Sequence, residues 1–493
     1  MRTIPSAVRT ALVTAITAVG LTTSTLHAQA ASQDDIKALR EQIQQLDQKL
    51  RALERNTEIK DETAAAEAKK QAKISFTDKG IGFTSADGNN YLKLHGLVQV
   101  DNRSFVGGQA GPNNNDAFLI RRARLIFEGG FAKNYEYLIV PEFGGNSGSS
   151  ASSNVTLLDA YINVNLRPEF QVRAGRFREP VGLEQLQSDA VAFFAERSIV
   201  SQFVPNRDIG VQLWGDVLNN TLGYAVGFFN GVPDGTNNGT NTDGNNDKNF
   251  AARLFAQPFK NDKDSFFAGL GFGVGGSIGK ENNNAGGLTG GYKTDGQQTW
   301  FGYNAATTAA PVTSGAVANG NVSRISPQAY FYKGPVGLMA EYVVSSVEAR
   351  NVRTTAPAAT NKQQLQNTAW QVSAGYVLTG EDAGYKGVTP ATNFSFADGT
   401  WGAFEVVARV EHADIDDGAF AGPAATRLAN INTSASGLTA YGIGLNWYLS
   451  KTVRASFDYF HTQFDLAPGA APAPTSVISH DENAFVTRLQ LTF

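Results

Sequence analysis

The sequence predicts an all-β transmembrane barrel of sixteen antiparallel strands, preceded by an N-terminal coiled-coil helix in the periplasm. Three observations predict this fold. From Tyr91 onward, apolar and polar residues alternate with a period of two. Short and long connections alternate along the same part of the chain, as they do between the strands of a membrane barrel. No run of eighteen apolar residues is present, so transmembrane helices are not the main architecture.

The composition excludes several other classes of protein. Cysteine is absent, which leaves neither a disulfide framework nor a thiolate metal site. The formal net charge of -4 is not typical of a protein that binds nucleic acid. None of the five histidines stands in a zinc-binding spacing. We therefore predict no metal, no cofactor, no catalytic residue and no nucleic-acid partner.

Residues 1–30 are predicted to be a secretory signal peptide. Arg2 and Arg9 give a positively charged start, residues 11–21 form a short apolar core, and residues 28–30 supply the small-x-small cleavage pattern. The core is too short and too rich in threonine for a membrane anchor. Together with the barrel pattern, this signal predicts the outer membrane of a Gram-negative bacterium, with its lipid as a partner.

Residues 31–60 are predicted to form a coiled-coil oligomerisation helix. Isoleucine at position a and leucine at position d of a heptad repeat favour a two-stranded coiled coil. The alternative is a surface helix that packs on the rest of the chain. Residues 61–89 are predicted to be a linker to the barrel, which we place at 90–493. The apolar residues of the helix are spaced by three and four, in the a/d pattern of a heptad repeat: Ile36, Leu39, Ile43, Leu46, Leu50 and Leu53.

Sixteen segments of the barrel region are predicted to be strands. In 403–411, for example, Phe404 and Val406 alternate with Glu405 and Arg409, so one face is apolar and the other is polar. Segments of about ten residues are long enough to cross a bilayer at a tilt. The sheet must close, because lipid satisfies no backbone hydrogen bond. The predicted strands are 91–104, 117–128, 135–143, 156–166, 170–177, 208–216, 221–230, 249–258, 266–279, 323–332, 336–347, 368–379, 402–413, 438–448, 452–464 and 483–493.

The connections predict which end of the barrel faces the periplasm. Those after even-numbered strands are mostly short, whereas those after odd-numbered strands are mostly long and rich in glycine and asparagine. The link 380–401 is a long exception, and residues 297–303 are either a strand extension or a hairpin within a loop. An even strand number leaves both ends of the barrel region on the periplasmic side. The terminal Phe493 is the signal that barrel-assembly machinery is expected to read.

Seven short motifs lie along the barrel region: FLIRRAR at 118–124, GRFREPVGLE at 175–184, AERS at 195–198, PNRDIG at 205–210, LTGE at 378–381, GAFE at 402–405 and GLNWYL at 444–449. In these motifs, of which the second is the most specific, the chain resembles the phosphate-selective porin O and P family. The long link 380–401 agrees with the family, in which a Thr-Gly-Glu turn opens an extended periplasmic segment. The resemblance implies a homotrimer of sixteen-stranded barrels whose third long loop folds into the lumen.

The resemblance also implies an arginine- and lysine-lined path for anions such as phosphate or pyrophosphate. Arg122 and Arg124 share a face of the second strand with Glu128, and the residues between them are apolar, so both arginines are expected to face the lumen. By strict alternation Arg121 faces outward. Arginine suits oxyanions, because its planar fork matches their oxygens. The candidate anion-path residues are Arg122, Arg124, Arg173, Arg176, Arg178, Arg197 and Arg207.

Other interpretations stay open. Arg178 with Glu179, and Glu196 with Arg197, are local ion pairs in the structural alternative, where they hold the inward loop to the wall. Residues 179–206 hold one arginine, no lysine and four acidic residues, unlike the lysine-rich segments of the family. A general porin of low specificity is therefore the first alternative. A trimeric structural or adhesive surface protein is the second, and a soluble secreted β protein is the third.

Overall fold

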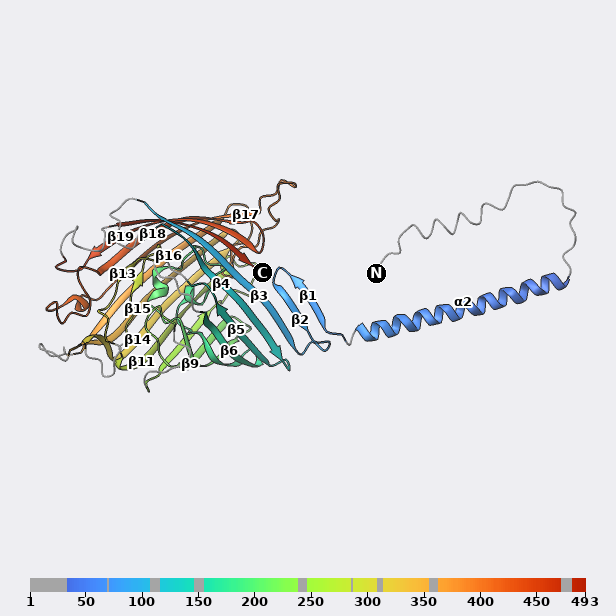
Figure 1. Ribbon diagram of the computed structural model, residues 1–493, viewed down its shortest axis with the longest axis horizontal. Coiled ribbons are helices and arrows are strands. Elements are labelled where there is room, and N and C mark those ends of the chain that lie inside the picture. Colours follow the sequence, from blue (N-terminus) through green and yellow to red (C-terminus); the bar gives the residue numbers. More distant parts are fainter. Residues whose placement is uncertain are drawn as a thin grey trace. The chain divides into compact units, whose positions relative to one another are not determined.

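The structure is a computed structural model that describes residues 33–68, 71–106, 116–145, 155–237, 246–284, 287–307, 314–353, 362–470 and 481–493. The chain forms two units, Met1–Gln71 and Ala72–Phe493, which are described separately (Figure 1). The predicted signal peptide, 1–30, lies outside the described residues. In the part of the chain that is described, no helix is both long and apolar enough to cross a membrane.

The first unit contains one long helix, α2, Gln33–Ala68, which continues past the predicted end at residue 60. Its first turn carries two aspartates, where the positive end of the helix dipole favours negative charge. All six residues of the heptad seam are exposed, from 47% for Ile36 to 66% for Leu46. An apolar seam that is exposed along its whole length is the surface through which a coiled-coil helix associates with another helix.

A β-hairpin opens the second unit, inside the segment 61–89 for which the sequence predicts a linker. Strand β1, Lys73–Thr77, pairs with β2, Gly80–Thr84, and β2 pairs in turn with the first residues of the barrel. Ile74 and Phe76 are exposed on this hairpin, at 72% and 84%. The alternation of apolar residues in 73–84 is the sequence signal that indicates this short sheet.

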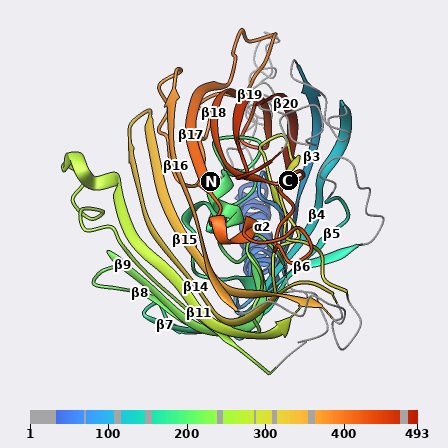
Figure 2. The ribbon, with the colours of Figure 1, turned by 90° about the vertical axis from the view of Figure 1, so that its left-hand side faces the viewer.

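Sixteen antiparallel strands form a closed barrel, which confirms the predicted fold. The ring closes where β20 pairs with β3, and Gly96 and Phe493 exchange two backbone hydrogen bonds at the seam (Figure 2). The strands are β3 Tyr91–Phe105, β4 Ala117–Phe131, β5 Tyr135–Glu142, β6 Thr156–Arg167, β7 Phe170–Arg178, β8 Arg207–Val217, β9 Leu222–Phe229, β10 Asn249–Ala256, β11 Leu270–Asn284, β14 Ser314–Lys333, β15 Val336–Arg353, β16 Gln363–Val377, β17 Ala403–Asp414, β18 Ala435–Tyr448, β19 Val453–Leu466 and β20 Asp481–Thr492.

Several observed strands differ from the predicted segments in their bounds, most of all β14 and β15. β14 and β15 extend well beyond the predicted 323–332 and 336–347, because their paired residues continue past the membrane-length core. Residues 266–269, predicted to start a strand, form a short 3₁₀ helix instead, and the Ser265 side chain accepts a hydrogen bond from the Phe267 amide there. Residues 297–303 belong to a small loop hairpin, β12 Tyr292–Lys293 with β13 Thr299–Phe301.

The barrel has a polar interior and an apolar exterior. On β17, Glu405, Arg409 and Glu411 are at most 4% exposed, whereas Val406, on the other face, is 38% exposed. On β20, Arg488 is buried and Leu489 is 58% exposed. A soluble β-sandwich has the opposite arrangement, with apolar residues inside and polar residues in water. The soluble interpretation is therefore wrong.

The two ends of the barrel differ. We call the end at which β3 begins and β20 finishes the turn end, and the opposite end the loop end. Most turn-end connections are tight; in one of them, residues 218–220 all have positive φ. The segment 378–402 is the long exception that the sequence predicted. Its Tyr385 contacts a loop inside the barrel: the Tyr385 carbonyl accepts a hydrogen bond from the Gln187 side chain, and the Tyr385 hydroxyl donates one to the Leu183 carbonyl.

Two loop-end connections fold into the lumen. Loop L3, residues 179–206, joins β7 to β8, and loop L5, residues 287–307, lies between β11 and β14. The two loops contact each other: the rings of Phe203 and Tyr292 stack at 4.2 Å, and Gln202 exchanges two 2.6 Å hydrogen bonds with the backbone of Lys293. Figure 2, viewed into the barrel, shows ribbon inside the ring of strands. The inward fold of L3 agrees with the expectation from the resemblance, whereas L5 was not predicted.

Candidate functional site

Loop L3 is held in the lumen by its apolar side chains. Phe193 packs against Tyr332 and Phe194 against Phe460, with ring centroids 6.2 and 5.4 Å apart. Leu183 is fully buried in the same cluster. These residues lie on the side of the lumen formed by β14–β20, so L3 fills that side and leaves space along the opposite wall.

Polar side chains of the barrel wall satisfy the L3 backbone. Glu341 accepts hydrogen bonds from the amides of Leu183 and Glu184, at 2.8 and 3.1 Å. Asn446 donates to the Phe193 carbonyl at 2.7 Å, and Arg454 donates to the carbonyl of the preceding residue at 2.9 Å. A buried loop needs such partners, because unpaired backbone groups away from water cost free energy. The polar interior of the barrel therefore positions L3 through its backbone.

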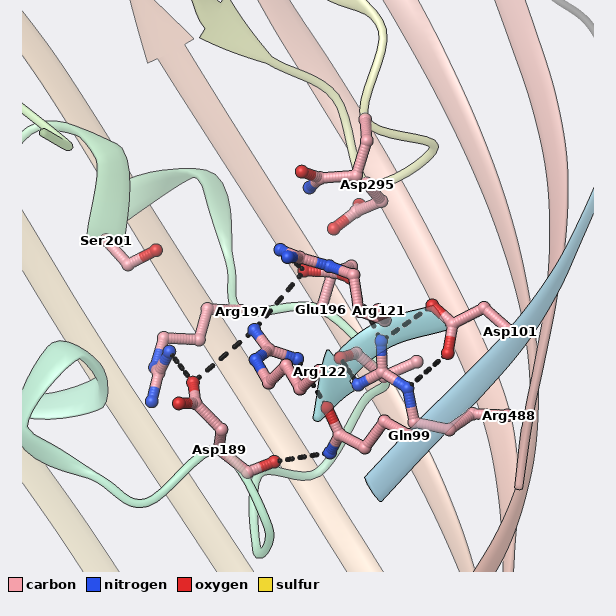
Figure 3. A network of polar contacts seen from close by, with 12 residues as sticks. Gln99, Asp101, Arg121, Arg122, Asp189, Glu196, Arg197, Ser201, Asp295 and Arg488 are labelled. Atoms are coloured by element: carbon pink, nitrogen blue, oxygen red, sulfur yellow. Dashed lines mark hydrogen bonds and ion pairs between the residues drawn. The ribbon is translucent and has the colours of Figure 1, made fainter. Parts of the chain in front are cut away.

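Asp189 of L3 lies at the centre of four arginines. Its carboxylate contacts Arg122 at 3.4 Å and Arg178 at 3.2 Å, and it forms short ion pairs with Arg124 and Arg197. Figure 3 shows Arg122 and Arg197 on either side of this carboxylate. Arg124 also contacts Glu142 of β5 at 2.6 Å, which ties the cluster to the wall.

Glu196 of L3 is the centre of a second group. It accepts a hydrogen bond from Arg103 at 2.7 Å. It also accepts one from Arg488 at 3.0 Å and a bidentate pair from Arg121 at 2.6 and 3.0 Å; Figure 3 labels Glu196 with these two arginines. Arg488 also holds Asp101 of β3 through two hydrogen bonds of 2.6 and 2.7 Å. The local ion pair between Glu196 and Arg197 that the sequence suggested is not formed, since each residue pairs with a different partner.

A β-bulge turns Arg121 into the lumen. Gln99 of β3 pairs with Arg122, but the next residue, Val100, pairs with Ile120, so Arg121 is an extra residue in β4. A bulge breaks the alternation of side chains by one position. The prediction that Arg121 faces outward was therefore wrong: strict alternation fails where a strand gains a residue, and two consecutive arginines face the same interior.

The whole cluster carries more positive than negative charge. Seven arginines meet four carboxylates, an excess of three positive charges in a largely buried site. Burying charge without a partner is costly, so a surplus of this kind is a place where an anion is stabilised. The arginines are Arg103, Arg121, Arg122, Arg124, Arg178, Arg197 and Arg488, and the carboxylates are Asp101, Glu142, Asp189 and Glu196.

Asp189 and Glu196, the two L3 carboxylates of this cluster, stay ionised. Burial raises the pKa of Asp189, but the surrounding guanidinium groups, Arg122 first among them, hold that pKa well below its usual range. The pKa of Glu196 is likewise well below its usual range, because Arg121 and Arg103 outweigh the effect of burial. Both groups therefore remain negative across physiological pH and compete with any anion for the arginines.

An open cavity of about 450 Å³ adjoins this cluster. We call it the outer cavity, because β-strand ends and loops of the loop end surround it. Six basic and four acidic side chains line it, which again leaves a positive surplus. The basic ones are Arg121, Arg122, Arg124, Arg197, Arg207 and Lys293, and the acidic ones are Glu142, Asp189, Glu196 and Asp234.

The structure separates the seven candidate arginines. Arg122, Arg124, Arg197 and Arg207 line the outer cavity. Arg207 is paired with Asp159 at 3.1 Å, and Arg178 reaches the cluster through Asp189. Arg176 is 7% exposed and does not appear among the described residues that line this cavity.

Arg173 lies elsewhere in the lumen. Its guanidinium stacks on the rings of Tyr161 at 4.4 Å and Trp214 at 4.8 Å. Sequence reasoning also missed Arg103, Arg488 and Lys293. The two arginines lie on polar faces of predicted strands, so alternation indicates them once the inward face is known; Lys293 depends on the fold of L5.

One sequence pattern matches a catalytic motif but lies in the wrong kind of element for that role. Residues 275–279 match G-x-S-x-G, which in hydrolases places a nucleophilic serine on a sharp strand-to-helix turn. Ser277 instead lies in the middle of β11, where it pairs with Ala251 on one side and Arg324 on the other. Among the described residues, no group of three His, Asp or Glu side chains is placed to hold a metal ion.

A pH dependence is expected from Glu179, the first residue of L3. It is fully buried, and neither carboxyl oxygen has a hydrogen-bond partner among the described residues. Burial, aided by the Asp208 carboxylate, raises its pKa to about 8, although Arg324 opposes the shift. The native state then keeps a proton that the unfolded chain releases above about pH 4.5, so stability falls as the pH rises from about 4.5 to about 8.

Glu179→Gln should remove this dependence. We expect the midpoint of thermal unfolding to fall between pH 5 and pH 9 in the wild-type protein and to fall less in the variant. An identical decline in both proteins would assign the effect to other groups.

Comparisons with known proteins agree with the architecture. The family model described as phosphate-selective porin O and P matches residues 92–493. No curated protein resembles the sequence closely enough to count as a match. The chain is similar to the solved structure of the outer-membrane channel DcaP of Acinetobacter baumannii, with 12% identity and a TM-score of 0.50, over 84% of this chain and 99% of that one.

Two further structures are similar at comparable levels. OmpF of Salmonella typhi, solved with daunomycin, has 12% identity and a TM-score of 0.49, over 85% of this chain and 100% of that one. An anion-selective porin from Comamonas acidovorans has 11% identity and a TM-score of 0.47, over 82% of this chain and 100% of that one.

Proposed function

Because the chain belongs to the phosphate-selective porin O and P family, whose members are passive channels of the outer membrane, we propose that it conducts small anions such as phosphate or pyrophosphate through an arginine-lined constriction. One observation carries the proposal. The outer cavity is the open space beside seven arginines that meet only four carboxylates. A passing anion is attracted there and a passing cation is repelled.

The geometry suggests how an oxyanion crosses. Guanidinium groups offer paired N–H donors that match the oxygens of phosphate. Asp189 and Glu196 already occupy some of these donors, so an arriving anion exchanges with a carboxylate rather than entering an empty site. Conduction needs binding that is favourable enough for entry and weak enough for release. Competition from the two L3 carboxylates keeps binding weak.

A general porin of low specificity is the second candidate. It is favoured by the pairing of the cavity arginines: Arg121, Arg124, Arg197 and Arg207 each contact a carboxylate. An arginine that is paired with a carboxylate selects for anions less strongly than an unpaired one, because the carboxylate cancels part of its positive potential. The two candidates differ in whether phosphate binds long enough to impede chloride.

Ion selectivity tests the proposed function. The purified protein is inserted into a planar bilayer, and the reversal potential is measured in a KCl gradient before and after phosphate is added. We expect a chloride-favouring potential and a phosphate-dependent fall in current. Arg124→Gln should weaken the phosphate effect about tenfold, since a charge-assisted hydrogen bond is worth roughly 1.5–3 kcal/mol.

The matched control is Arg427→Gln, in a loop-end connection outside the outer cavity, which should behave as the wild type. A chloride-favouring potential without any phosphate effect supports the general porin. A cation-favouring potential without phosphate block contradicts the anion channel and leaves the general porin.

We also propose that α2 associates as a periplasmic coiled coil in a homotrimer. Its exposed heptad seam supports association, and the family resemblance favours three chains over the two that isoleucine at a suggests. The barrel has an even number of strands, so the barrel region begins and ends at the same end. The short turns of outer-membrane barrels face the periplasm, which supports a periplasmic location for the helix.

The absence of cysteine gives a direct test of helix association. Leu50→Cys introduces a single thiol into the seam, and we expect it to form disulfide-linked chains on oxidation. Adding Leu46→Asp should abolish most of the cross-linking, because a charge at a seam position is not buried at low cost. Gln45→Asp changes the neighbouring residue outside the seam and should leave the cross-link intact. Equal cross-linking with both changes would show that the seam is not the contact.

A further inference from the structure

A second, smaller cavity lies at the turn end of the lumen. It has a volume of about 190 Å³, and we call it the inner cavity. Gly215, Asp216 and Gly223 line it next to the tight turn between β8 and β9, whereas Pro180 and Leu186 of L3 line it from inside the barrel. It therefore lies between the underside of L3 and the wall formed by β7–β10.

Three arginines line the inner cavity: Arg173, Arg178 and Arg253. Arg253 donates to Gln328 at 2.9 Å and stacks on the ring of Phe255 at 4.4 Å. Among the described residues, neither Arg173 nor Arg253 has a carboxylate partner within ion-pair distance. This distinguishes them from the arginines of the outer cavity, and a half-buried guanidinium without a counter-ion is a place for an anion.

The stacking of Arg173 fixes where its donors point. Tyr161 and Trp214 lie against the guanidinium, so its N–H groups project from the edge of the stack. The buried Nε atoms of Arg173 and Arg178 have no hydrogen-bond partner among the described residues. Trp214 is itself held by a 3.0 Å hydrogen bond to Asn163, which makes the stack rigid.

An ion pair links the wall of the inner cavity to the wall of the outer one. Arg178 lines the inner cavity, and its guanidinium contacts Asp189, which lines the outer cavity. Asp189 thus contacts arginines of both cavities, and the two cavities are neighbouring places for an anion in the lumen. Channels use adjacent weak sites in this manner, because each one lowers the barrier between its neighbours.

We propose that the inner cavity binds small organic monocarboxylates. This inference rests on the proposed anion channel and names a class of solute for it. Arg178 shares Asp189 with Arg122, Arg124 and Arg197, and Arg173 and Arg253 face one lining carboxylate, Asp216, so the inner cavity keeps a positive surplus. That surplus attracts an anion, and a planar carboxylate fits the guanidinium fork. The apolar remainder of the lining favours a single carboxylate group over the more highly charged phosphate.

The rest of the lining fits a short apolar body. Pro180, Leu186 and Ala225 line the cavity together with the ring of Trp214. Apolar walls with a few placed polar groups are typical of sites for organic ligands. The volume is below the roughly 300 Å³ at which pockets for drug-sized ligands begin, so the solute is small. Inorganic phosphate gains nothing from these apolar walls.

Calorimetric titration of the full, detergent-solubilised protein with benzoate tests the proposal. We expect saturable binding to the wild-type protein and at least tenfold weaker binding to Arg253→Gln. Ala225→Leu fills the cavity without changing its charge and should also weaken benzoate binding tenfold or more. The control is Arg167→Gln, which removes an exposed arginine at the same end of the barrel.

The outcomes separate the inner cavity from the outer one. Phosphate block of the current should be unchanged in Arg253→Gln and Ala225→Leu if the inner cavity is selective for carboxylates. Equal benzoate affinity in the wild type and both variants overturns the proposal, as does a loss seen only in Arg124→Gln. If the channel favours cations while benzoate binding still depends on Arg253, the anion-channel proposal fails and the inner site stands.

Discussion

Asp189→Asn should make the channel more selective for anions and strengthen block by phosphate at least tenfold. The wild-type carboxylate contacts Arg122, Arg124, Arg178 and Arg197, and it lines the outer cavity. An anion about 4 Å from this charge is repelled by roughly 4 kcal/mol at an effective dielectric constant of 20. A tenfold change in affinity needs only about 1.4 kcal/mol, so even a screened fraction of this repulsion is measurable.

The measurement is phosphate titration of single-channel current, with the reversal potential recorded in the same bilayers. Asp414→Asn is the matched control, since it removes an aspartate whose side chain is 60% exposed at the loop end. Its current and reversal potential should match the wild type. If Asp189→Asn instead weakens phosphate block, the carboxylate organises the arginines for the solute and does not compete with it.

Arg488→Gln should loosen L3 more than any single change to a cavity arginine. The side chain is fully buried, and it bridges Asp101 of the wall to Glu196 of L3. It also donates to the Ala195 carbonyl. Removing one partner of a buried ion pair costs up to about 3–5 kcal/mol. Here Arg103 still pairs with both Asp101 and Glu196, so we expect L3 to loosen rather than the barrel to unfold.

Hydrogen exchange of the L3 amides measures this effect. We expect faster exchange around Ala195, whose N–H donates to Asp458, while the amides of the strands keep their protection. Arg488→Lys retains the positive charge but loses the planar guanidinium group, so we expect its L3 amides to exchange at an intermediate rate. Unchanged protection in the glutamine variant would mean that apolar packing of Phe193 and Phe194 holds L3 without the ion pairs.

The barrel could be predicted because its strands repeat one simple pattern. Alternation of residues such as Phe404 and Glu405 marks each strand, and the connection lengths give the order of turns and loops. Strand ends were less predictable at β14 and β15, whose pairing continues beyond the membrane into residues without a distinct alternation. Contact with lipid requires an apolar side chain at every second residue. Residues outside the lipid are free of this requirement, so the alternation no longer indicates a strand there.

The site could be predicted only in part. Arg122 and Arg124 were identified correctly as lumenal, because they lie in a regular stretch of β4. The role of Asp189 could not be inferred, since it depends on how L3 folds back over residues distant in the chain. The same holds for Lys293, which L5 brings to the outer cavity. Contacts between loops carry no periodic signal, so only the fold reveals them.

The bulge in β4 has a consequence for how such a pore can evolve. Before the bulge, Phe118 and Ile120 lie on the outer face and are 83% and 52% exposed. After the bulge, the outer face continues with Ala123 and then with every second residue, Leu125 and Phe127. Removing the single codon for Arg121 would join these two stretches into an unbroken strand with every lipid-facing residue still facing lipid. Loss of almost any other codon in β4 would instead exchange the two faces. A one-codon insertion or deletion here can therefore add or remove a pore charge while the membrane-facing surface is inherited unchanged.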